Sequence, residues 1–439
     1  MKYPTWPVHS FMKREDLGLE RVQKLLDALG NPEKKMAPVF HVAGTNGKGS
    51  TTTFLKSILE AYGYTVHRNT SPHLVRFNER IEICGKEITD EYYNELADKC
   101  KSIMEKNNIT ASWCEIVTAI AFMAFAENPA DATIVEVGLG GRLDATNVVQ
   151  NLYASIITPI SYDHTKTLGD TLSKIAFEKA GIIKEGVPCV IAKQPEETSK
   201  VINEIASKKG SPTYEYGKNW MFKQINDSEC YYEGIYKMIK TPLPSLLGEH
   251  QLINAGSAIT ALLCQNKITV SENAIRTGIT KAFWKARLQN LTNTKFNEYI
   301  DNNTLLYIDG CHNEGAATVI ANWLDSENKK DERQNILILS MLERKDTKAF
   351  VHNIAHSIDR VIIMDNNHHY DEEEKYRTID EFKEDFAEAG FDMSKIDSTS
   401  DILDSLKKTQ NYTGKKRVLI CGSLYFSGDV LELIEDNKI

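Results

Sequence analysis

One stretch near the start of the chain, VFHVAGTNGKGSTTTFL, constrains the fold more than any other. A β-rich apolar run opens into a segment with three glycines and Lys48, and a helical pattern follows from Lys48 to Tyr62. Glycines let a loop turn its backbone N–H groups toward a phosphate, and the lysine and the helix N-terminus add positive charge. We therefore predict a nucleotide phosphate loop (P-loop) between a strand and a helix.

The stretch departs from the usual phosphate-loop signature at two positions. Val42 stands where the first glycine is usual, and Gly49 separates Lys48 from Ser50. The alternative is a plain glycine-rich turn between a strand and a helix. That alternative explains the glycines but not the lysine, so the phosphate loop remains the prediction.

The remainder of the chain alternates strands with helices in two stretches. From Pro38 to Ile191, runs such as ATIVEVG and ASIIT alternate with helical patterns, which is typical of a mainly parallel sheet. Short polar and aromatic strands from Thr213 to Leu247 predict a small antiparallel subsidiary sheet. The alternation restarts with TLLYIDG, NILILS and RVLICG, which predicts a second, smaller α/β domain. Because the alternation restarts after LQNLTNTK, we place the P-loop-containing N-terminal domain at 1–290 and the second at 291–439.

Composition excludes several classes of protein. Lys plus Arg at 52 against Asp plus Glu at 61 gives a net charge of -9, the wrong sign for a general binder of nucleic-acid backbones. The 8 cysteines include no Cys-x-x-Cys pair, so neither a zinc cluster nor a small disulfide scaffold is indicated. No signal-peptide core and no run near the roughly 18–20 apolar residues of a membrane span is present. We expect a cytoplasmic protein without nucleic-acid or membrane partners.

Polar side chains follow other strands at the edge of the sheet where the phosphate loop is expected. A second glycine cluster follows the strand ATIVEVG, Asp163 and His164 follow ASIITPI, and Glu115 begins an apolar helix. Ligands gather beyond the carboxyl ends of strands in open α/β sheets, and carboxylate and imidazole groups beside phosphates suit Mg²⁺. Each residue alone also has a structural explanation, since a glutamate at a helix N-terminus complements the dipole and a lone histidine is often structural.

The second domain offers Asp309 and His312 in YIDGCHNEGA, and Arg287 precedes it in WKARLQ. An acid and an arginine that face a nucleotide would position its ribose and phosphates, and an ion pair between domains is the alternative. The acidic run HHYDEEEK, with His368 and His369, is predicted to be a solvated loop and not a metal site.

Segments spread in order over nearly the whole chain resemble the folylpolyglutamate synthase and dihydrofolate synthase family of the Mur ligase superfamily. They are LGLERVQKLLDALGNP, HVAGTNGKGST, TSPHLVRFNERI, VEVGLGGRLDATNVV, DHTKTLGDTLSKIAFEKAGIIK, GEHQLINAGSAITAL, ARLQ, IDGCHN and CGSLYFSG. The resemblance implies a Mur-ligase-like fold and an ATP-dependent ligase that adds L-glutamate to 7,8-dihydropteroate, to the γ-carboxyl of tetrahydrofolate (poly)glutamates, or to both. In that family ATP phosphorylates the carboxylate, and the glutamate amine attacks the acyl phosphate.

Matching the family's motifs assigns the site residues. ATP contacts are implied for Gly44, Thr45, Asn46, Gly47, Lys48, Gly49, Ser50, Asn254, Arg287, Asp309 and His312. Mg²⁺, with two ions expected, is implied at Ser71, Glu115, His164 and Lys179, the last in the position of the family's carbamylated lysine. The pterin end of the substrate is implied at Ser71, Pro72, His73, Arg76 and Arg80. The catalytic charges are implied to be Lys48, His164, Lys179 and Arg287, with an ordinary helical lysine as the alternative for Lys179.

Three positions depart from the family pattern: Glu314 and Lys285 stand where prolines are common, and Cys311 stands where alanine is common. The alternatives are another Mur-superfamily amino-acid ligase, of UDP-muramyl or cyanophycin type, and a non-catalytic nucleotide-binding module. A UDP-muramyl ligase is expected to carry a separate uridine-binding domain. The roughly 37 residues ahead of the phosphate-loop strand are too few for such a domain. The expected partners are ATP, L-glutamate and a pterin or folate, and the expected state is a monomer.

Overall fold

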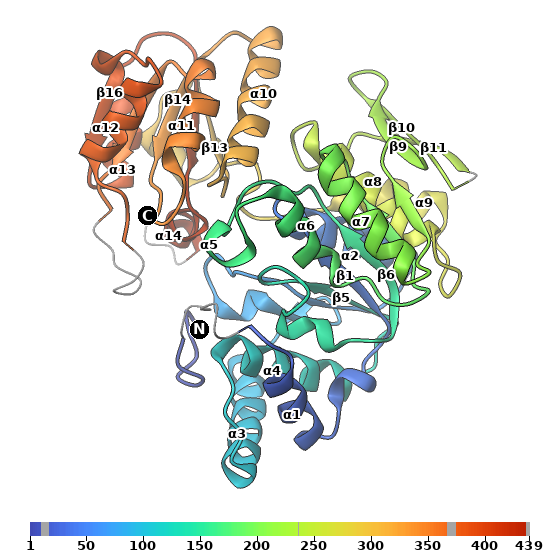
Figure 1. The fold of residues 1–439 in the computed structure, drawn as a ribbon. Helices are drawn as coiled ribbons and strands as arrows, with labels where there is room; N and C mark the ends of the chain where they lie inside the picture. The colour runs from blue at the N-terminus through green and yellow to red at the C-terminus, as the bar shows by residue number, and fades with distance from the viewer. Residues whose placement is uncertain (10–16, 236, 367–374, 436–439) are drawn as a thin grey trace. The chain divides into compact units, whose positions relative to one another are not determined.

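The computed structural model describes residues 1–9, 17–235, 237–366 and 375–435. These residues fall into two compact units (Figure 1). Unit 1 comprises Met1–Ser245 and Gln251–Phe283, and unit 2 comprises Leu246–His250 and Trp284–Ile439. The predicted surface loop that carries His368 and His369 lies outside the described residues.

Unit 1 is built on an eight-stranded sheet with the order β4-β3-β2-β5-β1-β6-β7-β8. Its strands are β1 (Val39–Ala43), β2 (Val66–Asn69), β3 (Ile81–Ile83), β4 (Lys86–Glu87), β5 (Ala132–Glu136), β6 (Leu152–Ile157), β7 (Cys189–Ile191) and β8 (Thr213–Glu215). From β2 to β8 every neighbouring pair is parallel, and β3 and β4 add an antiparallel edge. Strands β1, β5 and β6 are buried along their whole length, as parallel strands covered on both faces are. The prediction of a mainly parallel sheet is confirmed.

The helices of unit 1 connect and cover these strands. They are α1 (Glu20–Ala28), α2 (Lys48–Tyr62), α3 (Asp90–Asn107), α4 (Trp113–Glu127), α5 (Thr165–Leu168), α6 (Leu172–Ala180), α7 (Glu196–Lys208), α8 (His250–Leu263) and α9 (Glu272–Lys281). The predicted helix from Lys48 to Tyr62 is confirmed by α2. Helix α4 is apolar on nearly every side and lies in the main hydrophobic cluster. Helix α9 packs so closely on α2 that a Cβ at Gly278 would lie 2.4 Å from Ile58 Cα.

The predicted antiparallel sheet has three strands in the order β11-β10-β9. These are β9 (Trp220–Gln224), β10 (Glu229–Gly234) and β11 (Lys237–Pro242). The sequence assigned the whole segment from Thr213 to this sheet, and that was wrong for its first strand. Strand β8 pairs in parallel with β7 in the main sheet, because its residues continue the βα alternation after α7.

Unit 2 holds a six-stranded sheet with the order β12-β13-β17-β14-β15-β16, parallel except for β12. Its strands are β12 (Gln289–Asn290), β13 (Thr304–Ile308), β14 (Gln334–Leu339), β15 (Arg360–Met364), β16 (Ile396–Thr399) and β17 (Lys416–Cys421). Its helices are α10 (Glu314–Lys330), α11 (Thr347–Ile354), α12 (Ile379–Glu388), α13 (Ile402–Thr409) and α14 (Leu424–Glu435). The unit has its own apolar core, as the restarted alternation of strands and helices predicted.

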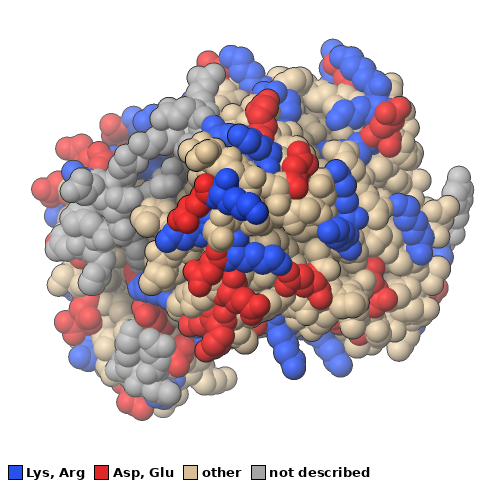
Figure 2. Space-filling model, turned by 90° about the horizontal axis from the view of Figure 1, so that it is seen from below, with Lys and Arg blue, Asp and Glu red and all other residues tan. Residues whose placement is uncertain are grey.

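The surface carries charges of both signs. Figure 2 shows lysine and arginine side chains interspersed with aspartate and glutamate side chains on the face that it views. This mixture agrees with the moderate net charge of -9. Within the described ranges, no helix combines the length and the apolar character needed to cross a membrane.

Candidate active site

The loop between β1 and α2 adopts backbone conformations that favour glycine. Gly44 has a φ of 152° and Gly47 a φ of 86°. A Cβ at Gly44 would lie 1.8 Å from Thr158 Oγ1, and one at Gly47 would lie 2.3 Å from Asn254 Oδ1. The two glycines therefore let the loop pass close to the segment after β6 and to helix α8. This contact also brings Asn254, a predicted nucleotide contact, against the phosphate loop.

Side-chain hydrogen bonds fix the middle of the loop. Thr45 Oγ1 donates to Ser161 O at 3.1 Å, and Asn46 Nδ2 donates to Ser161 Oγ at 3.2 Å. Gly49 and Ser50 lie buried in the first turn of α2. The first N–H groups of a helix have no partner within the helix, and its dipole favours negative charge there. The loop and the start of α2 therefore have the geometry that the predicted phosphate loop requires.

Two lysine ammonium groups meet at one carbonyl of this loop. Lys48 Nζ donates to Gly44 O and to Thr45 O, each at 3.2 Å, and Lys179 Nζ donates to Gly44 O at 2.9 Å. Burial, and then the Lys48 charge, lower the pKa of Lys179 to about 7. The structure thus brings together Lys48 and Lys179, which lie far apart in the sequence. Such a pair suits a polyanion, because an anion relieves the repulsion between the two ammonium groups.

The second glycine cluster forms a loop organised by the carboxylate of Asp144. Asp144 Oδ2 accepts the Leu139 N–H at 2.9 Å, and Oδ1 accepts the Thr146 N–H at 3.0 Å. Burial raises the pKa of Asp144, although these N–H groups oppose the rise. A Cβ at Gly138 would lie 3.3 Å from Asp144 Oδ2 and 3.7 Å from Ser71 Oγ. The predicted metal ligand Ser71 therefore lies beside this loop.

His164 follows β6 at the start of α5, in a left-handed backbone conformation with a φ of 50°. Its backbone N–H donates to Asp163 Oδ1 at 2.9 Å, and its Nε2 lies 3.8 Å from the same oxygen. Burial lowers the pKa of Lys179, and the negative charge of Asp163 partly opposes this lowering. The Asp163 carboxylate therefore lies near the Lys179 ammonium group. Asp163 thus lies between His164, which it contacts, and Lys179, which contacts the phosphate loop at Gly44.

Glu115 has partners that explain its position without a metal. It caps α4 together with Ser112, whose N–H donates to Glu115 Oε2 at 2.6 Å, and Arg21 Nε lies 3.1 Å from the same oxygen. In the described part of the chain, its buried Oε1 atom has no hydrogen-bonding partner. The predicted metal role of Glu115 stays a prediction.

Glu136 is a candidate site residue that the sequence alone did not indicate. Glu136 is the last residue of β5, is 5% exposed, and pairs in register with Val42, two residues before Gly44. A buried carboxylate at the carboxyl end of a central strand lies where α/β sheets bind ligands. Its place beside the phosphate-loop strand could be found only once the strand order was known, because the run TIVEVG looks like core.

The predicted pterin-binding loop, Ser71 to Arg80, is held by its own polar side chains. Arg80 Nε donates to His73 Nδ1 at 2.9 Å, and the Arg80 guanidinium lies 4.9 Å from the centre of the Trp113 ring. Both side chains are buried, and burial and the Arg80 charge lower the pKa of His73. The imidazole is therefore neutral, with Nδ1 as the acceptor. These contacts stabilise the loop and bury the Arg80 guanidinium.

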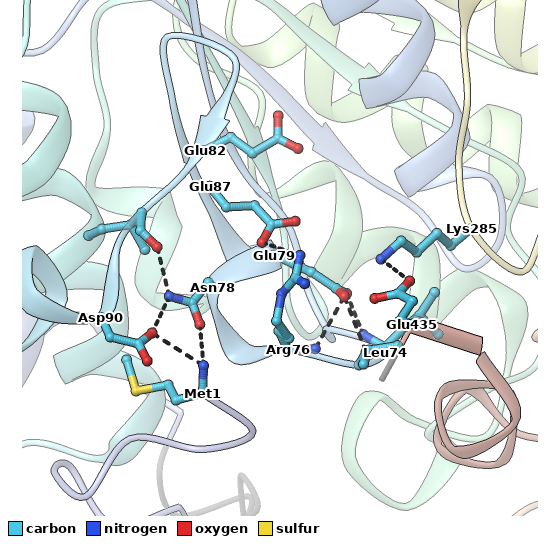
Figure 3. Close-up of polar contacts among 12 residues, drawn as sticks. Met1, Leu74, Arg76, Asn78, Glu79, Glu82, Glu87, Asp90, Lys285 and Glu435 are labelled. Atoms are coloured by element: carbon cyan, nitrogen blue, oxygen red, sulfur yellow. Dashed lines mark hydrogen bonds and ion pairs between the residues drawn. The ribbon is translucent and has the colours of Figure 1, made fainter. Parts of the chain in front are cut away.

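Arg76 lies on the outer side of the same loop. Its Nη2 pairs with Glu87 Oε2 at 2.8 Å (Figure 3). The carboxylate of Glu79 accepts the N–H groups of Leu74 at 2.8 Å and of Arg76 at 3.2 Å. The turn after Ser71 and Pro72 is thus closed by Glu79, and the Arg76 side chain is half-exposed.

Three predicted nucleotide contacts cluster within unit 2. Asp309 Oδ2 accepts the Leu288 N–H and Oδ1 accepts the Cys311 N–H, each at 2.8 Å, and burial raises the Asp309 pKa. A Cβ at Gly310 would lie 2.9 Å from Arg287 Nη1, so the guanidinium lies against the loop after β13. His312 Nδ1 lies 2.8 Å from the Gly310 carbonyl oxygen, which requires a proton on Nδ1. Asp309 therefore joins the Arg287 turn to this loop.

Comparisons with known proteins agree with the observed fold. Residues 42–262 match the family model "Mur ligase middle domain", and residues 292–433 match "Dihydrofolate synthetase, C-terminal domain". The Bacillus subtilis protein named dihydrofolate synthase/folylpolyglutamate synthase is 36% identical to this chain and covers 94% of it, with 94% of that protein covered. The chain belongs to the dihydrofolate synthase/folylpolyglutamate synthase family. The resemblance inferred from the sequence is confirmed, and a UDP-muramyl or cyanophycin ligase is not supported.

Solved structures give the same result. The structure of Escherichia coli FolC in complex with DHPP and ADP superposes with a TM-score of 0.85 at 30% identity, over 99% of this chain and 96% of that one. A bifunctional folylpolyglutamate synthase/dihydrofolate synthase from Yersinia pestis, complexed with AMPPNP and Mn ion, superposes with a TM-score of 0.82 at 26% identity. This superposition covers 98% of this chain and 95% of the Yersinia pestis chain. These family members therefore share the fold of this chain.

Proposed function

We propose that this chain is an ATP-dependent ligase that joins the amine of L-glutamate to a pterin carboxylate. The acceptor is 7,8-dihydropteroate, the γ-carboxyl of a tetrahydrofolate (poly)glutamate, or both. The observation that carries the proposal is the convergence of Lys48 and Lys179 on the Gly44 carbonyl at a glycine-rich loop. The family of the chain, and the relative that binds DHPP and ADP, support the choice of substrates.

The proposed chemistry needs alignment and charge neutralisation, and no nucleophilic side chain. A carboxylate oxygen of the pterin attacks the γ-phosphorus of ATP, the bond to the β,γ-bridging oxygen breaks, and ADP leaves. The glutamate amine then attacks the acyl carbon, and phosphate leaves with one oxygen of the original carboxylate. Two anions approach each other in the first step, so the ammonium group of Lys48 lowers its barrier by offsetting their charge.

A divalent cation fits the polar groups beside the phosphate loop. Ser71 near Gly138, His164 at the start of α5, and Glu136 at the end of β5 supply hydroxyl, imidazole and carboxylate donors. The described residues contain no group of three or more His, Cys, Asp or Glu side chains able to enclose an ion. Mg²⁺ suits such a sparse set, since it usually keeps waters and phosphate oxygens as ligands. The bound ion would neutralise charge on the phosphates, and the relative complexed with AMPPNP and Mn ion supports a divalent metal.

We include Glu136 beside the predicted Glu115 as a candidate carboxylate for this ion, because Glu136 is buried at the end of β5 in register with Val42 of the phosphate-loop strand. Carbamylation of Lys179 remains a prediction. The lowered pKa of Lys179 favours the neutral amine that attacks carbon dioxide, which supports it. Loss of activity in Lys179→Ala with rescue by a short-chain carboxylate would support the carbamate, and full activity of that variant would refute it.

Unit 2 is proposed to bind the nucleotide through Arg287 and His312. The guanidinium suits a phosphate, and the contact of His312 Nδ1 with the Gly310 carbonyl oxygen holds the imidazole at the same loop. Asp309 is proposed to act mainly by holding the Arg287 turn, since both of its oxygens accept backbone N–H groups. The monomeric state, the cytoplasmic location and the presence of two metal ions remain predictions.

The function is tested by measuring phosphate release from MgATP and L-glutamate in the presence of one pterin at a time. The acceptors are 7,8-dihydropteroate and a reduced folate monoglutamate, and the products are identified by mass. Activity with both acceptors identifies a bifunctional enzyme, and activity with one identifies either the synthase or the polyglutamate ligase. No amide with either acceptor, from folded protein that binds MgATP, would refute the proposal.

A further inference from the structure

The Arg287 side chain projects from a strained turn. Its neighbours Ala286 and Leu288 have φ angles of 50° and 45°, although neither is glycine. L-amino acids adopt such angles rarely, and the conformation persists only where the surrounding structure holds it. The contacts that hold this turn therefore also determine where the Arg287 guanidinium lies.

One side of the turn is held by the loop after β13. The Leu288 N–H donates to Asp309 Oδ2 at 2.8 Å, and the Gly310 N–H donates to Ala286 O at 3.0 Å. Arg287 Nη1 also donates to Ala286 O at 2.7 Å. These bonds involve Ala286 and the residues after it, and a contact of Lys285 adds an anchor at the residue before the turn.

That anchor is an ion pair between Lys285 and Glu435. Lys285 Nζ lies 2.6 Å from Glu435 Oε1, and the two side chains are 26% and 27% exposed (Figure 3). Glu435 belongs to α14, so the pair joins this helix to the residue before the turn.

We propose that the Lys285–Glu435 ion pair is a positioning device that holds the strained turn and so places the Arg287 guanidinium for a nucleotide phosphate. The proposal rests on the proposed function, in which Arg287 binds the nucleotide. Glu435 and Lys285 are positioning residues because neither touches the nucleotide in this account.

The first test compares Glu435→Gln and Lys285→Met with the wild type in the full chain. Each variant is expected to raise the dissociation constant of MgADP and the KM for ATP about three- to five-fold, the scale of a partly exposed ion pair. The turnover number kcat is expected to change less than about two-fold. The charge-swapped variant K285E/E435K is expected to restore most of the affinity. Unchanged affinity in both single variants would overturn the proposal.

The second test repeats Glu435→Gln in an Arg287→Ala background. If the Lys285–Glu435 pair acts through Arg287, Glu435→Gln does not weaken MgADP binding further in the Arg287→Ala variant. An equal loss of affinity in both backgrounds would overturn the proposal, because the pair would then act by another route.

The matched control is Lys408→Met, which removes a pair of similar exposure in the same unit. Lys408 Nζ lies 3.0 Å from Asp397 Oδ1, with exposures of 34% and 31%. This control is expected to bind MgADP as the wild type does, and a loss equal to that of Glu435→Gln would overturn the proposal. Calorimetry measures MgADP binding without turnover. The role of the Lys285–Glu435 pair is therefore tested even if the chain shows no ligase activity. A wild-type chain that does not bind MgADP would overturn it.

Discussion

Gly47→Ala should disrupt the phosphate loop through two separable effects. The φ of 86° is unfavourable for any residue with a Cβ, at a cost of about 1–2 kcal/mol. The new Cβ would also lie 2.3 Å from Asn254 Oδ1. Asn254 is 2% exposed, and its Nδ2 donates to Gln251 Oε1 at 2.9 Å, so it cannot simply turn away. Overpacking of this kind costs about 1–3 kcal/mol, which brings the total to about 2–5 kcal/mol.

Gly63→Ala is the matched control at the other end of the same helix. Gly63 has a φ of 108°, and nothing lies within 4 Å of a Cβ placed there. It should therefore show backbone strain alone, with a fall in Tm of about 2–4 °C. Gly47→Ala should lower Tm at least twice as much and weaken MgADP binding at least about ten-fold.

The two effects of Gly47→Ala are separated by removing the partner of the clash. Asn254→Ala should recover part of the stability that Gly47→Ala loses, measured as the coupling in a double-mutant cycle by thermal unfolding. Gly47→Ala with the stability and MgADP affinity of Gly63→Ala would refute the reasoning, since neither the clash nor the loop geometry would then matter.

Three further predictions concern charged groups of the site. Lys48→Ala or His164→Ala should abolish amide formation with an almost unchanged thermal transition, and an unfolded variant would remove the support for that assignment. The folded-state pKa of Lys179 is lowered to about 7, so the unfolded chain binds more protons between that pH and the ordinary lysine pKa of about 10.4. Stability to urea should rise with pH across this window, and Lys179→Met should flatten the rise; equal slopes would contradict it. Asp309→Asn leaves one of two backbone N–H groups without an acceptor, so urea unfolding should show a loss of about 1–3 kcal/mol, which wild-type stability would disprove.

The parts of the fold with local signals could be predicted from the sequence. The bounds of α2 follow from a glycine loop at one end and Gly63 at the other, both visible in the sequence. Strand β8 could not be assigned to its sheet in this way, because its partner β7 lies across the whole of α7. Pairing between distant segments depends on tertiary contacts that short-range patterns do not encode.

The candidate site shows the same division. Lys48 and Gly47 were predicted because the phosphate loop is continuous in sequence. The role of Asp309 in holding the Arg287 turn depends on two backbone N–H groups, one of them 21 residues away, so residue type alone could not indicate it. Glu136 was missed for a related reason, since a single acid inside an apolar strand becomes informative only when the neighbouring strand is known.

The central claim is that the pterin carboxylate is activated by phosphorylation before the amide forms. It is tested most directly by supplying 7,8-dihydropteroate or a reduced folate with ¹⁸O in the reacting carboxylate, together with MgATP and L-glutamate. If an acyl phosphate forms, each released phosphate carries one ¹⁸O atom, because the carboxylate oxygen that attacked phosphorus leaves with it. Amide product accompanied by phosphate without ¹⁸O would contradict the account.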